Sequence, residues 1–425
     1  IQIMRLSTFL FFLPSLSCFN LIGQSEFENV KITGANDPNE PSIAIHPQKE
    51  RWMAVGVNLN RVYISKNGGK KWKKKVMHSD FGVWGDPVMH ISETGRIYYF
   101  HLSNPEIGNW IDRIVCQYSD DKGKTWTPGS FTGLNGEKAQ DKHWVASRGD
   151  TLVLTWTQFD KYGSREASDS SNIYFSSSID AGETWSDAIR INQVSGDCVD
   201  SSNTTEGAVP AFGNEGEIYV SWAGPAGLRF DKSLDGGKTW LKNDVLIDEN
   251  YTGWNYSIPG IYRTNGMPIT LVDQSDGPNR GTIYVCWSDQ RNGAENTDVF
   301  VSKSKDKGAT WSEAVRVNDD STNRQQFLCW MSIHPETGAL YSVFYDRRNY
   351  SDFQTDVYLA YSKDGADSFS NLRISEKPFV PKQRVFFGDY TNIAVSGNSL
   401  RPVWARMDGG STSVWTALID LRKLP

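Results

Sequence analysis

Five acidic residues recur at one position of a repeating pattern, at or just before the start of a short apolar segment. They are Glu40, Asp86, Asp141, Glu206 and Asp389. Carboxyl groups that lie close together raise one another's pKa, so one can keep its proton at neutral pH while a neighbour is ionised. A pair of that kind supplies a general acid and an ionised partner for cleavage of a covalent bond. The pattern therefore predicts acid–base chemistry wherever the fold brings these residues together.

Side chains with complementary abilities lie beside the acidic residues. A phenol or an imidazole accepts a proton, an indole ring stacks on a sugar, and a guanidinium binds a carboxylate in bidentate fashion. We predict catalytic roles for Asp86, Asp141, His143, Glu206, Asp389 and Tyr390. We predict substrate-binding roles for Glu40, Trp84, Trp144, Arg263, Gln326 and Arg347. The alternative is that residues at these positions only hydrogen-bond neighbouring strands and trapped water.

An eight-residue motif, S-x-D-x-G-x-T-W, marks the repeat that must position these side chains. Strict copies begin at Ser119, Ser178, Ser233 and Ser304, and degenerate copies begin at Ser65 and Ser362. Successive copies start 54 to 71 residues apart, which fits one four-stranded propeller blade with its loops. Within a copy the Asp carboxylate accepts backbone N–H bonds, Gly permits a positive φ and Trp packs between sheets. The motif is therefore interpreted as the turn between the third and fourth strands of a blade, not as the reacting site.

Three short strands precede each copy, and a seventh set of three follows the last copy. That set begins with YTNIAVSG at Tyr390 and lacks a fourth strand, which FENVKITG at Phe27 can supply. The first strand of the fifth blade is assigned to PGIYRTN, beginning at Pro259. We therefore predict an all-β fold in residues 25–425, a seven-bladed β-propeller of four-stranded antiparallel blades closed by the N-terminal strand. Six blades are the alternative. Strand alternation places the mouth, with the candidate residues, on the face opposite the motif turns.

The motif resembles the Asp-box, or bacterial neuraminidase repeat, of sialidases and other secreted propellers that act on glycans. The resemblance implies a secreted glycan-processing enzyme, a sialidase-like exo-acting glycoside hydrolase with carboxylate and tyrosine chemistry in the central mouth. It implies a tyrosine nucleophile, for which Tyr390 is available, with Glu206 as its partner and Asp86 or Asp141 as the acid. Sialidases also carry an Arg-Ile-Pro motif, and here Ser257 stands at the arginine position.

Two other functions stay open. A polysaccharide lyase acting on uronic-acid glycans needs a base and a positive group, for which Tyr390, His143 and Arg263 are available. A non-catalytic propeller that binds a glycan or a protein is indicated by the serine at position 257.

Charge and the N-terminus limit the partners and the location. A net charge of −6 gives no basic footprint for nucleic acid and otherwise says little about a partner. The resemblance implies a glycan or polysaccharide as the partner, and the protein is expected to be a monomer. Residues 1–24, with Arg5 before an apolar stretch, are predicted to be a signal peptide, which would make the protein secreted, periplasmic or held at the cell surface. That stretch is too short and too interrupted by proline for a membrane span, and Cys18 is an alternative site of lipid attachment.

No cofactor is predicted, because no CxxC pair or Cys–His cluster indicates a metal site. Asp197 and Asp200, in the acidic stretch GDCVDSSNTTEG, offer a structural Ca²⁺ site. Four further cysteines allow three disulfide pairings and are interpreted as buried free thiols. They are Cys116, Cys198, Cys286 and Cys329.

Overall fold

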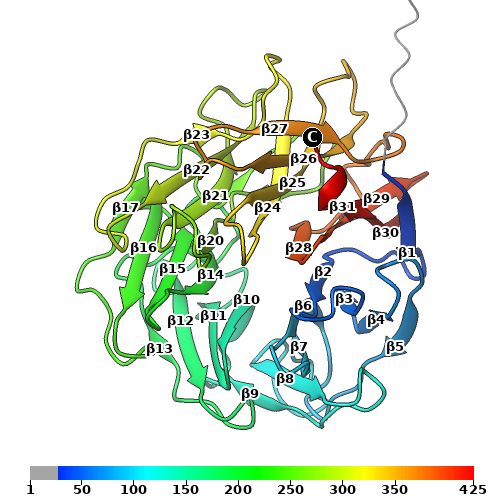
Figure 1. The fold of residues 1–425 in the computed structure, drawn as a ribbon. Coiled ribbons are helices and arrows are strands. Elements are labelled where there is room, and N and C mark those ends of the chain that lie inside the picture. The colour runs from blue at the N-terminus through cyan, green and yellow to red at the C-terminus, as the bar shows by residue number, and fades with distance from the viewer. Residues whose placement is uncertain (1–26) are drawn as a thin grey trace, which may run out of the picture.

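A computed structural model describes residues 27–425, so the predicted signal peptide and Cys18 lie outside the described residues. The described chain forms seven antiparallel sheets arranged around a central axis and one additional two-stranded sheet (Figure 1). The innermost strands of the sheets face the axis and the outermost strands lie at the rim. The prediction of a seven-bladed β-propeller is confirmed, and the six-bladed alternative is wrong.

Each of the first six blades runs from its innermost to its outermost strand in chain order. The first blade comprises β2 (Ser42–Ile45), β3 (Met53–Val57), β4 (Arg61–Ser65) and β5 (Lys73–Val76). The second comprises β6 (Gly85–Ile91), β7 (Ile97–Leu102), β8 (Ile114–Ser119) and β9 (Ser130–Thr132). The third comprises β10 (Ala139–Arg148), β11 (Thr151–Phe159), β12 (Ser171–Ser178) and β13 (Ile189–Arg190). The fourth blade comprises β14 (Glu206–Phe212), β15 (Ile218–Ala223), β16 (Leu228–Ser233) and β17 (Val245–Asp248). The fifth comprises β20 (Ile269–Val272), β21 (Ile283–Asp289), β22 (Asp298–Ser304) and β23 (Val315–Arg316). The sixth comprises β24 (Gln326–Ile333), β25 (Leu340–Asp346), β26 (Asp356–Ser362) and β27 (Ser370–Arg373).

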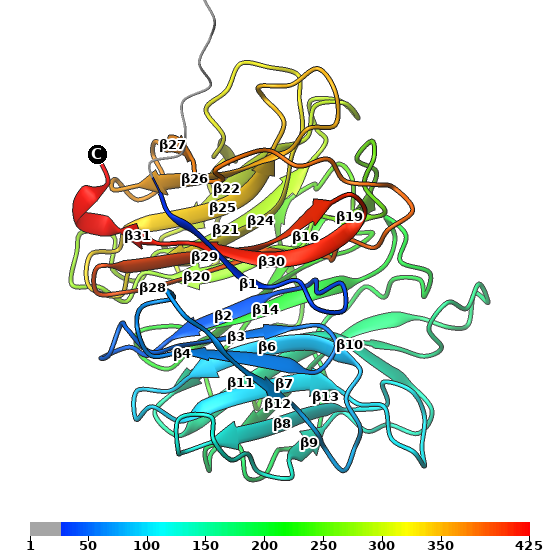
Figure 2. The ribbon, with the colours of Figure 1, turned by 90° about the vertical axis from the view of Figure 1, so that its right-hand side faces the viewer.

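The seventh blade joins the two ends of the described chain. It contains β28 (Asn392–Ser396), β29 (Ser399–Asp408) and β30 (Ser411–Ala417), and its fourth strand is β1 (Asn29–Thr33). β1 pairs antiparallel with β30, with Asn29 opposite Ala417, and Figure 2 shows the two strands side by side. The short β31 (Ile419–Asp420) pairs with β29 and leads into a 3₁₀ turn, η1 (Leu421–Lys423). The predicted closure by the N-terminal strand is confirmed, and it covers the edge of β30 that would otherwise be open.

The first strand of the fifth blade is not the one predicted. The segment from Pro259 lies in a small hairpin whose two arms are β18 (Asn255–Tyr256) and β19 (Thr264–Asn265), and β20 is the innermost strand. The apolar Ile258 and Ile261 are buried, which explains the strand-like pattern. Pro259 and Gly260 between them interrupt the extended backbone, as this pair of residue types does in turns. Arg263 therefore reaches the mouth from a hairpin and not from a blade.

The Asp-box turns fasten each blade to the one before it. In the copy at Ser233, the serine Oγ donates to Asp235 Oδ1 at 2.8 Å and accepts from the Gly237 N–H at 2.8 Å. Gly237 has φ +90°, and a Cβ there would meet the ring of Phe175 in the preceding blade at 2.3 Å. Trp240 packs edge-on against the same ring, with centroids 5.0 Å apart. The motif is thus a structural turn, as predicted.

Large aromatic side chains fill the space between blades. The indole rings of Trp156, Trp222, Trp287 and Trp404 are fully buried. The four cysteines of the described chain are buried and free, and the Sγ atoms of Cys286 and Cys329 lie 3.9 Å apart. Within residues 27–425, no helix has the length and apolar character needed to cross a membrane.

Candidate active site

A bulge recurs at the start of the innermost strands and shapes the mouth of the propeller. The register with the second strand shifts between Gly85 and Val88, Asp141 and Trp144, Glu206 and Val209, and Phe327 and Trp330. A bulge bends its strand and redirects the side chains at that point. The same local device therefore delivers residues from several blades to one place on the axis.

Three charged residues of the mouth have a strained backbone. φ is +50° at Asp86 and at Lys142, and +49° at Glu40. This left-handed conformation is uncommon for residues other than glycine, costs about 1–3 kcal/mol and gathers at functional sites. Asn58 holds two of the three: its Oδ1 accepts the N–H of Asp86 at 2.8 Å, and its Nδ2 donates to the carboxylate of Glu40.

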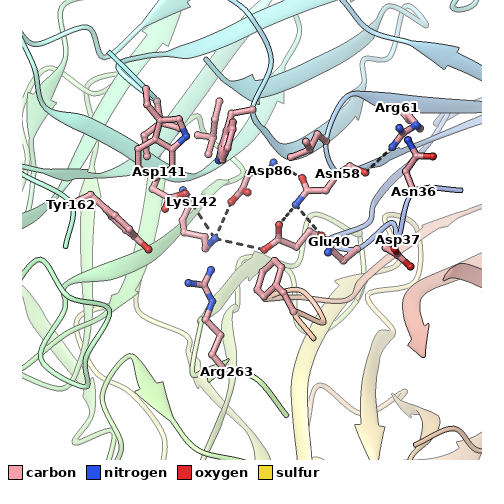
Figure 3. Close-up of a pocket in the computed structure, with 17 residues that line it drawn as sticks. Asn36, Asp37, Glu40, Asn58, Arg61, Asp86, Asp141, Lys142, Tyr162 and Arg263 are labelled. Carbon is pink, nitrogen blue, oxygen red and sulfur yellow. Dashed lines mark hydrogen bonds and ion pairs between the residues drawn. The ribbon is translucent and has the colours of Figure 1, made fainter. Parts of the chain in front are cut away.

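The ammonium group of Lys142 is the centre of the site. Its Nζ lies 2.8 Å from Asp389 Oδ2 and 2.9 Å from Asp86 Oδ2. Oxygens of Glu40 and Asp141 each lie 3.8 Å away. Lys142 is buried, and Figure 3 shows its side chain between Asp86 and Glu40. One cation thus joins carboxyl groups from four blades.

A second cation, Arg263, is also engaged by carboxylates. Its Nε donates to Asp389 Oδ1 at 2.8 Å and its Nη2 to Asp389 Oδ2, which makes a bidentate pair. Its Nη1 donates to Asp200 Oδ2 at 3.1 Å, and the hydroxyl of Tyr162 donates to the same oxygen at 2.5 Å. The hairpin that carries Arg263 is therefore fixed to the innermost part of the seventh blade.

Burial changes the protonation of the carboxyl groups in different directions. Burial raises the pKa of Asp141 to about 7, with Asp86 adding to the effect while Lys142 opposes it. Burial also raises the pKa of Glu40 and of Glu206 well above the usual range. Burial opposes ionisation of Asp389 too, but Arg263 and Lys142 outweigh it and hold the pKa of Asp389 well below its usual range. Protonated and ionised carboxyl groups therefore stand side by side at neutral pH.

A cavity of about 370 Å³ opens onto this cluster. Glu40, Asp86, Asp141 and Lys142 line it. Its rim carries Trp84 and Trp110, which are 39% and 41% exposed and pack edge-on with centroids 5.5 Å apart. Tyr162 continues the rim, 5.6 Å from Trp110 between centroids. The volume lies in the range of small-ligand sites, and the exposed rings suit stacking on a sugar.

The structure places the other predicted residues at three depths. Arg263 lines the same cavity, whereas Glu206 and Asp389 line a small adjoining pocket together with Lys142 and Arg263. His143, Trp144 and Tyr390 are buried beneath the site. Trp144 contacts Tyr390, with centroids 5.2 Å apart, and burial lowers the pKa of His143 to about 4. Their predicted catalytic and binding roles remain predictions.

Gln326 and Arg347 do not line the cavity or the adjoining pocket. Gln326 is buried and its Nε2 donates to Asp346 Oδ1 at 3.2 Å. Arg347 is buried as well, and its Nη1 donates to the carbonyl oxygen of Pro259 at 2.7 Å. Arg347 therefore supports the hairpin that carries Arg263 and is not positioned as a clamp for substrate.

Sequence reasoning missed Lys142, Asp200, Asn58, Tyr162 and Trp110. The sequence did contain a signal for Lys142, because Lys142 occupies the same position in the bulge of the third blade as Asp86 occupies in the bulge of the second blade. Asp200 was considered only as a calcium ligand together with Asp197. In the structure Asp200 binds Arg263, whereas Asp197 accepts hydrogen bonds from Ser201 and Thr204, so the two do not form a joint site. No group of three or more His, Cys, Asp or Glu within residues 27–425 is arranged to hold a metal ion.

Comparison with known proteins agrees with the repeat and the fold. A family model described as the BNR/Asp-box repeat matches residues 117–128, the turn of the second blade. No match to the chain was found among curated proteins. The chain carries Asp-box repeats on a seven-bladed β-propeller.

Three solved structures are similar to the fold over nearly their whole length. A protein of unknown function from Dyadobacter fermentans is 13% identical with a TM-score of 0.52, over 92% of this chain and 98% of that one. An α-L-arabinanase from Penicillium chrysogenum, complexed with arabinobiose, is 13% identical with a TM-score of 0.51, over 93% and 99%. The NanB sialidase from Streptococcus pneumoniae is 10% identical with a TM-score of 0.51, over 95% and 98%. At these identities the likeness concerns the fold.

Proposed function

We propose that this protein is an exo-acting glycoside hydrolase whose reaction takes place in the central mouth. The observation that carries the proposal is a pair of neighbouring carboxyl groups at the floor of the cavity, one with a raised pKa and the other bound to a lysine. Burial raises the pKa of Asp141 to about 7, and Asp86 forms an ion pair with Lys142 at 2.9 Å. Hydrolysis of a glycosidic bond uses an acid and an ionised carboxylate of this kind. Two structurally similar proteins, an arabinanase and a sialidase, act on glycans and support the choice of reaction class.

Asp141 and Asp86 have distinct roles in this reaction. Asp141 gives its proton to the glycosidic oxygen as the bond from that oxygen to the anomeric carbon breaks. Asp86 stabilises the positive charge that develops on the sugar ring. A water molecule then bonds to the anomeric carbon and gives a proton back to Asp141, which restores the acid. Lys142 holds the side chain of Asp86 in place through the ion pair at 2.9 Å, while the aromatic rim formed by Trp84 and Trp110 packs on the sugar.

A neutral sugar is the substrate class that the charges favour. Arg263 is paired with Asp389 and Asp200, so its guanidinium is not available to a substrate carboxylate. The carboxyl groups around the cavity also repel a negatively charged substrate. A sialidase-like specificity is the second candidate, because Arg61 lines the cavity and forms no ion pair within residues 27–425.

A panel of purified glycans tests the proposal. The protein is incubated with arabinobiose, other neutral disaccharides, sialyllactose and polygalacturonate, and the products are separated. Release of a terminal neutral sugar is expected. Release of sialic acid would favour the second candidate, an unsaturated uronate would replace the hydrolase with a lyase, and binding without any product would leave a non-catalytic propeller.

The hydrolysis rate is expected to fall as the pH rises through about 7. Asp141 acts in its protonated form, and its pKa is raised to about 7, so the acid is lost on the alkaline side. A kcat/KM profile from about pH 4 to pH 9 measures this limb. A rate that stays constant between about pH 6 and pH 9 would show that Asp141 is not the acid.

Trp84→Ala is expected to raise KM about fivefold with a smaller change in kcat. The exposed ring packs on bound sugar and not on the reacting atoms, and one aromatic contact contributes about 1 kcal/mol. Trp84→Phe, which keeps a ring, is the matched control and should retain most of the affinity. A loss confined to kcat would contradict the stacking role.

A further inference from the structure

A basic groove lies between the first and second blades, among the Asp-box turns. Its volume is about 570 Å³, and seven of its eleven lining residues are lysines. The first blade supplies one wall, from the Asp-box turn at Ser65 and strand β5, and the Asp-box turn of the second blade supplies the other. The lysines are Lys66, Lys71, Lys73, Lys74, Lys75, Lys122 and Lys124. The groove shares no lining residue with the catalytic cavity.

The positive charge of the basic groove is not neutralised by the protein. None of the seven lysines forms an ion pair with a carboxylate within residues 27–425. The first Asp-box contributes to this imbalance, because Asn67 stands where the other five copies have aspartate, and Lys71 stands at the threonine position. Asn67 Oδ1 still accepts from Ser65 Oγ at 3.0 Å and from the Lys71 N–H at 3.0 Å, so the turn keeps its shape without the negative charge.

The two walls are held at a fixed separation. Lys75 Nζ donates to the carbonyl oxygen of Lys124 at 3.1 Å, and Gly123 lies so close to Ile64 that a Cβ on it would meet Ile64 Cγ1 at 2.9 Å. Lys122 is placed by Trp52, with its Nζ 4.2 Å from the ring centroid. The charges are therefore arranged in advance along a groove.

Protection of an exposed sheet edge does not account for this arrangement. Lysines on an outer strand discourage pairing with another chain, and β5 is an outer strand. However, edge protection can account only for Lys73, Lys74 and Lys75, which follow one another on the exposed strand β5. The remaining lysines belong to turns, which present no edge. The excess of charge, in a chain with a net charge of −6, calls for an anionic ligand.

We propose that the basic groove binds an anionic polysaccharide, with sulfate or uronate groups spaced along a linear chain. Lysine acts as a point charge on such groups, and two facing walls fit a strand that runs between them. A flat anionic membrane does not reach the floor of a groove. The sole aromatic residue in the lining, Trp72, is half-buried and offers no platform for stacked bases, which argues against single-stranded nucleic acid. The site lies apart from the catalytic cavity and does not depend on the proposed hydrolysis.

Binding of defined polyanions to the whole protein tests the proposal. The probes are a heparin oligosaccharide and an oligogalacturonate, with a neutral dextran of equal length, single-stranded DNA and vesicles containing phosphatidylserine as comparisons. The triple variant Lys73→Ser/Lys74→Ser/Lys75→Ser is compared with Lys238→Ser/Lys242→Ser/Lys305→Ser, which removes three exposed lysines from the fourth and fifth blades. Titrations at several salt concentrations give the number of ions released on binding.

We expect the wild type and the control variant to bind an anionic oligosaccharide, and the groove variant to bind it at least tenfold more weakly. The slope of log K against log salt should fall by about two to three in the groove variant, because each lost contact releases about one fewer ion. Hydrolysis of a small neutral glycoside should be the same in all three proteins. Equal weakening in both variants, no binding of either oligosaccharide, or tighter binding of DNA or vesicles would overturn the proposal.

Discussion

Replacing Asp141 with asparagine is expected to lower kcat for glycoside hydrolysis by about 10²- to 10⁴-fold, the contribution of a positioned general acid. Asparagine keeps the size of the side chain and cannot give up a proton, so the leaving oxygen departs unprotonated. Because protonation matters less for a good leaving group, the loss should shrink for a dinitrophenyl glycoside. Rates on a natural disaccharide and on the activated glycoside, measured side by side, report this difference.

Two comparisons separate this effect from loss of structure. Asp276→Asn makes the same change at a fully exposed turn between β20 and β21 and should leave kcat unaltered. The Asp141→Asn protein should be at least as stable as the wild type at about pH 8. Asp141 binds its proton more tightly when folded, so its ionisation opposes folding as the pH rises from about 4 to about 7. An equal loss of rate on both substrates would contradict the role of Asp141 as the acid.

Replacing Lys142 with methionine is expected to lower the free energy of unfolding by about 3–5 kcal/mol at neutral pH, the range for breaking a buried ion pair from one side. The variant removes the cation that lies 2.9 Å from Asp86 and 2.8 Å from Asp389 in a buried site. Asp389 keeps its pair with Arg263, whereas Asp86 is left without an ion-pair partner within residues 27–425. The deficit should shrink at about pH 5, because protonation of the carboxyl groups relieves their repulsion. Denaturant unfolding at both pH values measures it.

Lys138→Met is the matched control, four residues earlier in the chain. Lys138 pairs with Asp160 at 2.8 Å, but its side chain is 37% exposed, so its loss should change the free energy of unfolding by less than about 1 kcal/mol. The double variant Lys142→Met/Asp86→Asn should recover part of the lost stability, since it removes the charge that the single variant leaves unpaired. A Lys142→Met protein as stable as the wild type would show that the ammonium group does not hold the cluster together.

The repeat made the fold predictable to a large extent. Each Asp-box marks one blade, and the strand at Phe27 had no partner other than the incomplete last blade. The exception was the fifth blade, where Ile258 and Ile261 are apolar because they pack into the core from a hairpin. Alternation of apolar residues does not distinguish that burial from a strand.

The site was predictable in its carboxyl groups and not in its cations. Strand starts of equivalent repeats converge on one axis, so Glu40, Asp86 and Asp141 were found by their position. The ion pairs that Lys142 and Arg263 form with carboxylates depend on a bulge and on a hairpin, respectively. Neither structure produces a periodic pattern in the sequence. The inward contacts of Arg347 were likewise hidden, because a buried arginine bound to backbone carbonyl oxygens has the same sequence signature as a ligand-binding one.

Closure of the ring by β1 makes the site a product of the completed chain. A carboxyl oxygen of Glu40, near one end of the described sequence, accepts a hydrogen bond from the backbone N–H of Asp389, near the other end, at 3.2 Å. β1 has no partner until β30 has been synthesised, almost four hundred residues later. An unfinished or clipped chain therefore lacks the closed ring and the full set of carboxyl groups at the same time. The proposed activity is therefore expected to depend on closure of the ring.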